Sequence, residues 1–162
     1  MPPDTFVQIW NMLIDDNTLR RVFYEHDNMT FPELVRYFDQ RLYPHRLLLL
    51  YTDKDGGAAG FGWFDDVKRG VRAFCSICMR KSHWGPPAEE ASVISLDYIF
   101  NAHEVVRVFG VTPKPNRMAL AQAKRLGFTV IAVVPGLSSY RGTVCDSTLT
   151  MMTKETFNGR WG

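Results

Sequence analysis

One segment near the middle of the chain restricts the possible folds more than any other. The apolar run from Val71 to Met79 predicts a strand, and Pro86 and Pro87 end it because two consecutive prolines cannot continue a strand. Proline is favoured in the first turn of a helix, so a mostly buried helix is expected over residues 88–102, followed by an apolar strand over residues 105–111. A strand, a helix and a strand in this order predict a crossover connection within a sheet that helices cover.

The elements before and after this segment complete a mixed fold. Residues 5–43 have apolar positions at helix spacing, and Thr30 followed by Glu33 is a capping-box pattern. A helix over residues 117–126 is expected to end at Gly127, which readily adopts the left-handed conformation. Further strands are expected over residues 46–52, 58–64, 129–134 and 147–153, with a hairpin turn over residues 65–70.

This order predicts a single α/β (α+β) domain over residues 1–162, with N-terminal helices in residues 1–45 and a core sheet in residues 46–153. Hydrophobic residues make up 46% and charged residues 22%, as in globular proteins. A net charge of +2 does not favour a nucleic-acid partner. No apolar run approaches the roughly 20 residues of a membrane helix, and the N-terminus lacks the features of a secretory signal. We therefore expect a cytoplasmic protein without a membrane partner, as a monomer or homodimer.

Cys75 and Cys78 have the C-x-x-C spacing that occurs in zinc and redox sites. A zinc site would need two further ligands, and no second pair lies near a histidine. A redox motif of this kind is expected at the start of a helix, whereas these residues lie inside a strand pattern. We expect buried cysteines in a strand and no metal site.

The turn before the expected helix over residues 88–102 has the composition of an anion-binding site. The first turn of a helix carries N–H groups without partners, and the helix dipole adds partial positive charge there. Arg80 and Lys81 bring charged side chains to the same turn, and Gly85 allows close approach to the backbone. These features predict a phosphate site at the start of the helix.

The same turn resembles a motif of the GNAT superfamily of N-acetyltransferases. That motif is Gln or Arg, two residues, Gly, one residue, and then Gly or Ala; Arg80, His83 and Gly85 occupy the three positions. The pair Trp84-Gly85 resembles the branch that acetylates ribosomal-protein N-termini and antibiotics. Divergent chains of phage and prophage genomes are similar as well.

A second segment resembles the same superfamily. Asn116 and Ala119, followed by a helix and then by Gly127-Phe128, are similar to the family signature Asn-x-x-Ala/Ser, helix, Gly-Phe. The resemblance covers residues 46–153 and implies a mixed, largely antiparallel central sheet with helices on both faces. It also implies acetyl-CoA as co-substrate and a small-molecule or peptide amine as acceptor.

The resemblance assigns roles to residues of this chain. The strand that precedes the turn diverges from the next strand in this family, and the gap admits the pantetheine arm, with the backbone of Met79 stabilising the oxyanion. The expected coenzyme-binding residues are Cys78, Met79, Arg80, Lys81, His83, Trp84, Gly85, Pro86, Pro87, Ala88, Asn116, Ala119 and Ala123.

Two residues depart from the family pattern. His83 replaces a glycine, and it is either a loop residue without a chemical role or, when protonated, a phosphate contact. Ala123 stands where many relatives have a tyrosine that protonates the coenzyme thiolate. Tyr140, in an expected loop, is the candidate replacement acid; the alternative is that it packs on the surface.

No general base stands out from the sequence. Asp65 and Asp66 fall in the expected hairpin turn, and Glu90 falls in the first turn of a helix, where each has an ordinary structural role. The sequence therefore leaves two hypotheses. One is an N-acetyltransferase in which an amine attacks acetyl-CoA directly, and the other is a non-catalytic GNAT-fold protein, related to those of phages, that binds or has a structural role.

Overall fold

The central feature of the fold is a six-stranded sheet with the strand order β1-β2-β3-β4-β6-β5. The computed structural model describes residues 3–26 and 28–162. The strands are β1 (Leu47–Thr52), β2 (Ala58–Lys68), β3 (Arg72–Met79), β4 (Arg107–Pro113), β5 (Thr129–Tyr140) and β6 (Thr143–Thr153). All neighbouring strands are antiparallel except β3 and β4, which are parallel. The largely antiparallel mixed sheet confirms the expected fold class.

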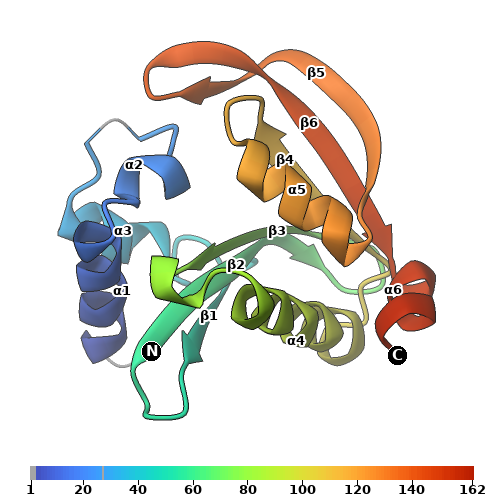
Figure 1. Cartoon of the computed structure of the whole chain (residues 1–162), viewed down its shortest axis with the longest axis horizontal. Coiled ribbons are helices and arrows are strands. Elements are labelled where there is room, and N and C mark those ends of the chain that lie inside the picture. Colours follow the sequence, from blue (N-terminus) through green and yellow to red (C-terminus); the bar gives the residue numbers. More distant parts are fainter. Residues whose placement is uncertain (1–2, 27) are drawn as a thin grey trace.

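Helices cover both faces of this sheet (Figure 1). They are α1 (Pro3–Asp15), α2 (Leu19–Val22), α3 (Phe31–Tyr37), α4 (Pro86–Ala102), α5 (Arg117–Leu126) and α6 (Lys154–Trp161). Phe61 and Trp63 of β2 pack on the cluster that α1–α3 form, whereas Phe64 packs on the cluster of α4–α6. Because successive side chains of a strand point to opposite faces, the two clusters lie on opposite sides of the sheet. None of the helices in residues 3–26 and 28–162 has the length and hydrophobicity that crossing a bilayer requires.

The crossover predicted from the middle of the chain is present. β3 leads through a single 3₁₀ turn (Lys81–His83) into α4, which crosses to the parallel strand β4. Leu96, Ile99 and Phe100 of α4 are almost completely buried. The capping box is also present, since the N–H of Thr30 donates to Glu33 Oε2 over 2.7 Å. Gly127 ends α5 with φ +105°, as its position predicted.

The expected hairpin turn over residues 65–70 is wrong in its boundaries, because β2 continues to Lys68. Asp65 lies in the strand and accepts hydrogen bonds from Trp63 Nε1, over 2.9 Å, and from Arg46 Nε. Asp66 has φ +47° at an irregularity of the β2–β3 ladder and pairs with Arg72 over 2.6 Å. Asp65 and Asp66 therefore form hydrogen bonds and an ion pair that could not be predicted from a sequence typical of a turn.

β5 and β6 are longer than the sequence indicated and form one hairpin. Its turn connects Tyr140, at the end of β5, to Thr143, at the start of β6. Arg141 and Gly142 both have positive φ, which matches the tight hairpin turn with the right-handed strand twist. The pairing register shifts between Val134 and Ser138, where the sequence has proline and glycine. This bulge lets the strand continue through residues that normally end one.

The C-terminal helix α6 was not expected from the sequence. Thr153 caps it by accepting the N–H of Thr156 over 3.1 Å, and Phe157 is 2% exposed and packs on Phe100 at 5.3 Å between ring centroids. The helix is short and has one fully buried side chain, so it shows little apolar periodicity.

We expect Phe157→Ala to lower the free energy of unfolding by about 3–5 kcal/mol, because it removes a large ring from a packed cluster. Urea denaturation measures this change. Asn158→Ala is the matched control, since Asn158 is exposed in the same helix. A loss below 1 kcal/mol in Phe157→Ala would show that α6 is not part of the cooperative core.

Candidate active site

A cavity of about 320 Å³ opens where β3 and β4 diverge. The two strands pair only through residues 72–74 and 107–109, although β3 continues to Met79 and β4 to Pro113. Beyond the paired residues the space between the strands is lined by Cys75 to Met79 on one side and by Gly110 to Pro113 on the other. The gap expected from the family resemblance is therefore part of this fold.

Eight of the sequence-predicted coenzyme residues line this cavity together: Cys78, Met79, Trp84, Gly85, Ala88, Asn116, Ala119 and Ala123. The other five, which are Arg80, Lys81, His83, Pro86 and Pro87, lie in the adjoining turn and helix start rather than in the lining. Tyr140 is the last residue of β5 rather than a loop residue, and it lines neither this cavity nor the one described below. The backbone fold, and not proximity in sequence, brings the start of α4 and the wall of α5 to the same gap.

Gly85 sets the direction in which α4 begins. Its φ of +85° and ψ of −132° are accessible to glycine and strained for other residues. Pro86 and Pro87 follow and have no N–H, while Glu89 donates its N–H to Gly85 O over 3.1 Å. In the first turn of α4, Ala88 is therefore the residue whose N–H remains available, at the positive end of the helix dipole. A helix start usually offers more backbone donors than this.

The turn at Arg80 and Lys81 is held by β2 and by the residues at the end of α1. Arg80 Nε donates to Ala58 O over 2.7 Å, and its guanidinium lies 3.8 Å from Asp15. The Lys81 N–H donates to Asp16 Oδ2 over 2.7 Å. These contacts fix the turn against α1 and β2. The sequence could not reveal them, because the partners lie more than twenty residues away along the chain.

His83 has a local partner in the 3₁₀ turn. Its Nδ1 lies 2.9 Å from the hydroxyl of Ser82, and the residue is partly buried. His83 has φ in the ordinary range, so replacement of the family glycine causes no backbone strain at this position. The side chain lies beside the start of α4, close to the turn but outside the cavity lining.

The N–H of Met79 points into the gap between the strands. The N–H of Arg80 donates to Ala59 O of β2 over 2.9 Å, and backbone groups of successive strand residues point to opposite edges. Met79 therefore directs its N–H and C=O away from β2. Its carbonyl accepts the indole N–H of Trp84 over 3.1 Å.

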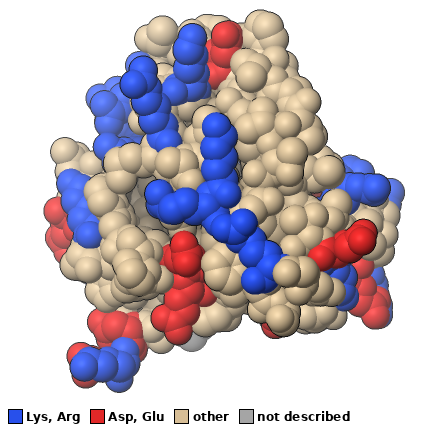
Figure 2. Space-filling view, turned by 45° about the vertical axis from the view of Figure 1, so that its right-hand side comes forward, with Lys and Arg blue, Asp and Glu red and all other residues tan. Residues whose placement is uncertain are grey.

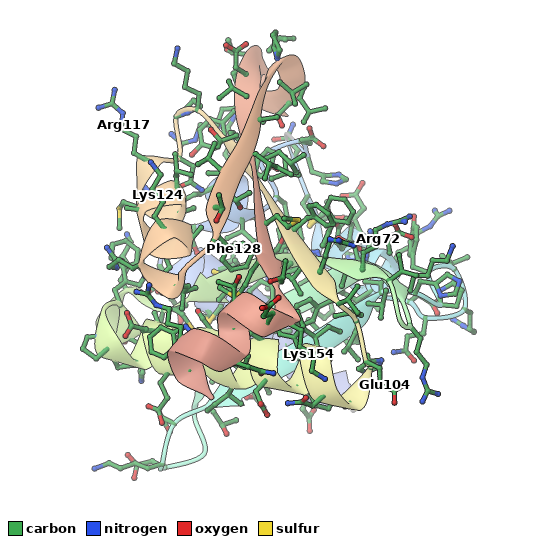
Figure 3. All side chains as sticks on the ribbon, turned by 90° about the vertical axis from the view of Figure 1, so that its right-hand side faces the viewer. Arg72, Glu104, Arg117, Lys124, Phe128 and Lys154 are labelled. Carbon is green, nitrogen blue, oxygen red and sulfur yellow. The ribbon has the colours of Figure 1, made fainter. Side chains whose placement is uncertain are left out.

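α5 forms the opposite wall of the cavity with small side chains. Asn116 caps the helix by accepting the N–H of Ala119 over 3.4 Å, and Ala119 and Ala123 keep the wall open. Arg117 and Lys124 are exposed and project outward from this helix (Figure 3). Figure 2 shows Lys and Arg side chains spread over one face of the molecule, some of them beside a hollow.

A second cavity of about 270 Å³ adjoins the first on the side of the N-terminal helices. The two share six lining residues: Val22, Tyr24, Trp63, Cys75, Ser76 and Val111. The second cavity also reaches polar and charged residues, namely Glu25, His26, Tyr37 and Asp65. The N–H of Ser139 in β5 donates to Glu25 Oε1 over 3.4 Å, so the hairpin of β5 and β6 closes this side. Asp65 was expected in a hairpin turn, and no motif in the sequence marks Glu25, His26 or Tyr37.

Burial raises the pKa of both Cys75 and Cys78 to about 12, so both thiols are neutral at physiological pH. Cys75 packs on the cluster of α4–α6 and Cys78 on the cluster of α1–α3, so their side chains face opposite sides of β3. They therefore cannot bind one ion together. In residues 3–26 and 28–162 no three His, Cys, Asp or Glu side chains are placed to hold a metal.

Solved structures of acetyltransferases resemble this chain over nearly its whole length. Spermidine N-acetyltransferase from Vibrio cholerae in complex with CoA and spermine has a TM-score of 0.83 at 15% identity, over 98% of this chain and 95% of that one. Ribosomal-protein-S5-alanine acetyltransferase from Vibrio fischeri has a TM-score of 0.77 at 15% identity, over 97% and 92%. No protein-family model and no curated protein sequence matches the chain. The structural similarity and the diverging strands together show that the chain has the fold of the GNAT N-acetyltransferases.

Proposed function

We propose that the protein transfers an acetyl group from acetyl-CoA to a primary amine by direct attack of the amine on the thioester. The observation that carries this proposal is the cavity between the diverging ends of β3 and β4, which continues into a second cavity. One cavity suits the coenzyme and the other suits the acceptor. The complex of the Vibrio cholerae enzyme with CoA and spermine supports this pairing of ligands.

The coenzyme would lie along the first cavity. Its pantetheine arm would occupy the gap beside Cys78 and Met79, and its pyrophosphate would lie at the start of α4, beside Gly85 and Ala88. Asn116, Ala119 and Ala123 would contact it from the opposite wall. The turn residues Arg80, Lys81, His83, Pro86 and Pro87 would act mainly by holding this helix start in place, since their side chains lie outside the lining.

Met79 would stabilise the charge that develops on the thioester oxygen. Its N–H faces the gap, and a backbone donor that is already in place needs no reorganisation during the reaction. The second cavity would hold the acceptor, and the Glu25 carboxylate in its lining suits an amine that carries positive charge when it binds. Spermidine and spermine are therefore suitable test substrates, together with a peptide that begins with alanine.

A non-catalytic binding role is the second candidate, favoured by two observations. Ala123 lines the cavity at the position where many members of the resembling family have a tyrosine that acts as general acid. The N–H of Lys81, in the turn before α4, already donates a hydrogen bond to Asp16. Both features reduce the chemical groups available to the coenzyme. A coenzyme-binding module would retain the cavity without turnover.

Release of free thiol from acetyl-CoA, measured over a panel of amines, separates these candidates. We expect amine-dependent release with saturation in both substrates. Binding of acetyl-CoA without release on any amine would contradict the transferase and favour the binding module. Absence of binding at millimolar acetyl-CoA would contradict both.

A further inference from the structure

Tyr24 occupies the place where the two cavities meet. It is one of the six residues that line both, and it follows α2 in the segment that leads to α3. If the coenzyme fills one cavity and the amine the other, the thioester carbon must lie where the first cavity approaches this junction, between the proposed donor Met79 and the shared residues, because the two reactants have to meet there. A side chain at the junction is therefore within reach of the bond that breaks.

The position of Tyr24 is fixed by the hairpin of β5 and β6. Its carbonyl accepts the N–H of Arg141 over 3.3 Å, and its ring lies 5.8 Å from the ring of Tyr140. Two buried hydroxyls, Ser138 and Ser147, hydrogen-bond to each other over 2.7 Å on the adjoining strands. The backbone and ring of Tyr24 are thus held against a C-terminal hairpin that lies more than one hundred residues away in sequence.

The other residues at the junction are poorer proton donors. Val22 and Val111 are aliphatic, and the indole N–H of Trp63 is bonded to Asp65 over 2.9 Å. Cys75 packs on the buried cluster of α4–α6, where burial raises its pKa to about 12. The alcohol of Ser76 is a weaker acid than a phenol. Tyr24 is therefore the junction residue best suited to give up a proton.

We propose that Tyr24 is the general acid of the transfer, replacing the tyrosine that Ala123 lacks; this rests on the proposed acetyltransferase function. The neutral amine forms a bond from its nitrogen to the thioester carbon, and the carbon–sulfur bond then breaks with its electron pair on sulfur. The Tyr24 hydroxyl gives its proton to that sulfur. The phenolate regains a proton that the former amine nitrogen releases, so the products are the amide and free CoA.

The surroundings of Tyr24 keep the phenol protonated at physiological pH. Burial raises its pKa above the usual value, the charges of Glu25 and Cys145 act in the same direction, and the Ser138 hydroxyl opposes them. The half-buried Tyr37 lies near enough that a charge on Tyr24 would add to the burial that raises the pKa of Tyr37, and the aromatic ring of Tyr140 packs on Tyr24. The wild-type rate should therefore rise as the amine loses its proton and fall again at more alkaline pH, as Tyr24 ionises.

The test is Tyr24→Phe, assayed by thiol release with the amine that the panel identifies. We expect kcat to fall about 100-fold, with the KM and Kd for acetyl-CoA within about twofold of wild type, and with the alkaline limb of the pH profile lost. Tyr98→Phe is the matched control, because Tyr98 is 41% exposed on α4 and lines neither cavity. Its kcat should be unchanged.

Each outcome decides between the acid and its alternatives. A kcat for Tyr24→Phe within twofold of wild type would overturn the assignment and leave the transferase function standing. A loss confined to Tyr140→Phe would transfer the role to Tyr140, the candidate from the sequence. Absence of thiol release by the wild type with every amine would overturn both the function and the acid. A rise in KM alone would make Tyr24 a binding residue and not the acid.

Discussion

Gly85→Glu is expected to abolish acetyl-CoA binding. Gly85 lines the cavity at the start of α4, where the pyrophosphate is proposed to bind, and a carboxylate there would repel it. No neighbouring atom lies within 4 Å of a Cβ built at this position, so the new side chain has room and the fold should persist. Titration calorimetry measures the loss of binding, and thermal unfolding measures the fold.

The control for this variant is Gly85→Ala. The backbone φ of +85° strains any residue other than glycine, so both variants should lose about 1–3 kcal/mol of stability. Only the glutamate adds negative charge to the cavity. We expect Gly85→Ala to retain coenzyme binding at reduced affinity; equal affinity of Gly85→Glu and wild type would show that the phosphate lies elsewhere.

Gly60→Ala is expected to lower both stability and activity, because Gly60 controls how closely β2 approaches the site. A Cβ at Gly60 would lie 2.6 Å from the carbonyl oxygen of Cys78 and would also collide with the sulfur of Met79. Backbone cannot give way cheaply at this distance, so β2 and β3 must separate where the proposed oxyanion donor lies. We expect the melting temperature to fall by several degrees and thiol release to fall even at temperatures where the variant is folded.

Gly159→Ala is the matched control for this effect. Gly159 lies in α6, a Cβ there meets no atom within 4 Å, and its φ is not in the left-handed region. The substitution should raise stability by about 0.5–1 kcal/mol, because alanine is the better helix residue. Full activity of Gly60→Ala in the folded state would show that catalysis does not depend on the spacing between β2 and β3.

The parts of the fold that the sequence predicted share a strong local pattern. The crossover segment combines a strand-length apolar run, two prolines that cannot continue it and an apolar helix, so each signal supports the same element. Elements that depend on distant partners were missed. The hairpin continues past Gly136 because the strand forms a bulge there. The helix α6 depends on the burial of Phe157 against Phe100.

In the candidate site too, residues with a local role could be predicted and residues that depend on distant partners could not. Gly85 and Asn116 could be placed from sequence because each has a local backbone role, as a helix start and a helix cap. The orientation of Arg80 could not, since it depends on Asp15 and Ala58. Tyr24 is held at the junction by the hairpin of β5 and β6, which contacts the segment after α2, and no local pattern marks that contact.

Amide chemical-shift mapping by NMR with CoA tests most directly whether the coenzyme occupies the gap between β3 and β4. We expect saturable shifts for the amides of Met79, Gly85 and Ala88, and for Ala119 and Ala123 across the gap. Saturable shifts confined to another surface, or no shifts at millimolar CoA, would contradict the account.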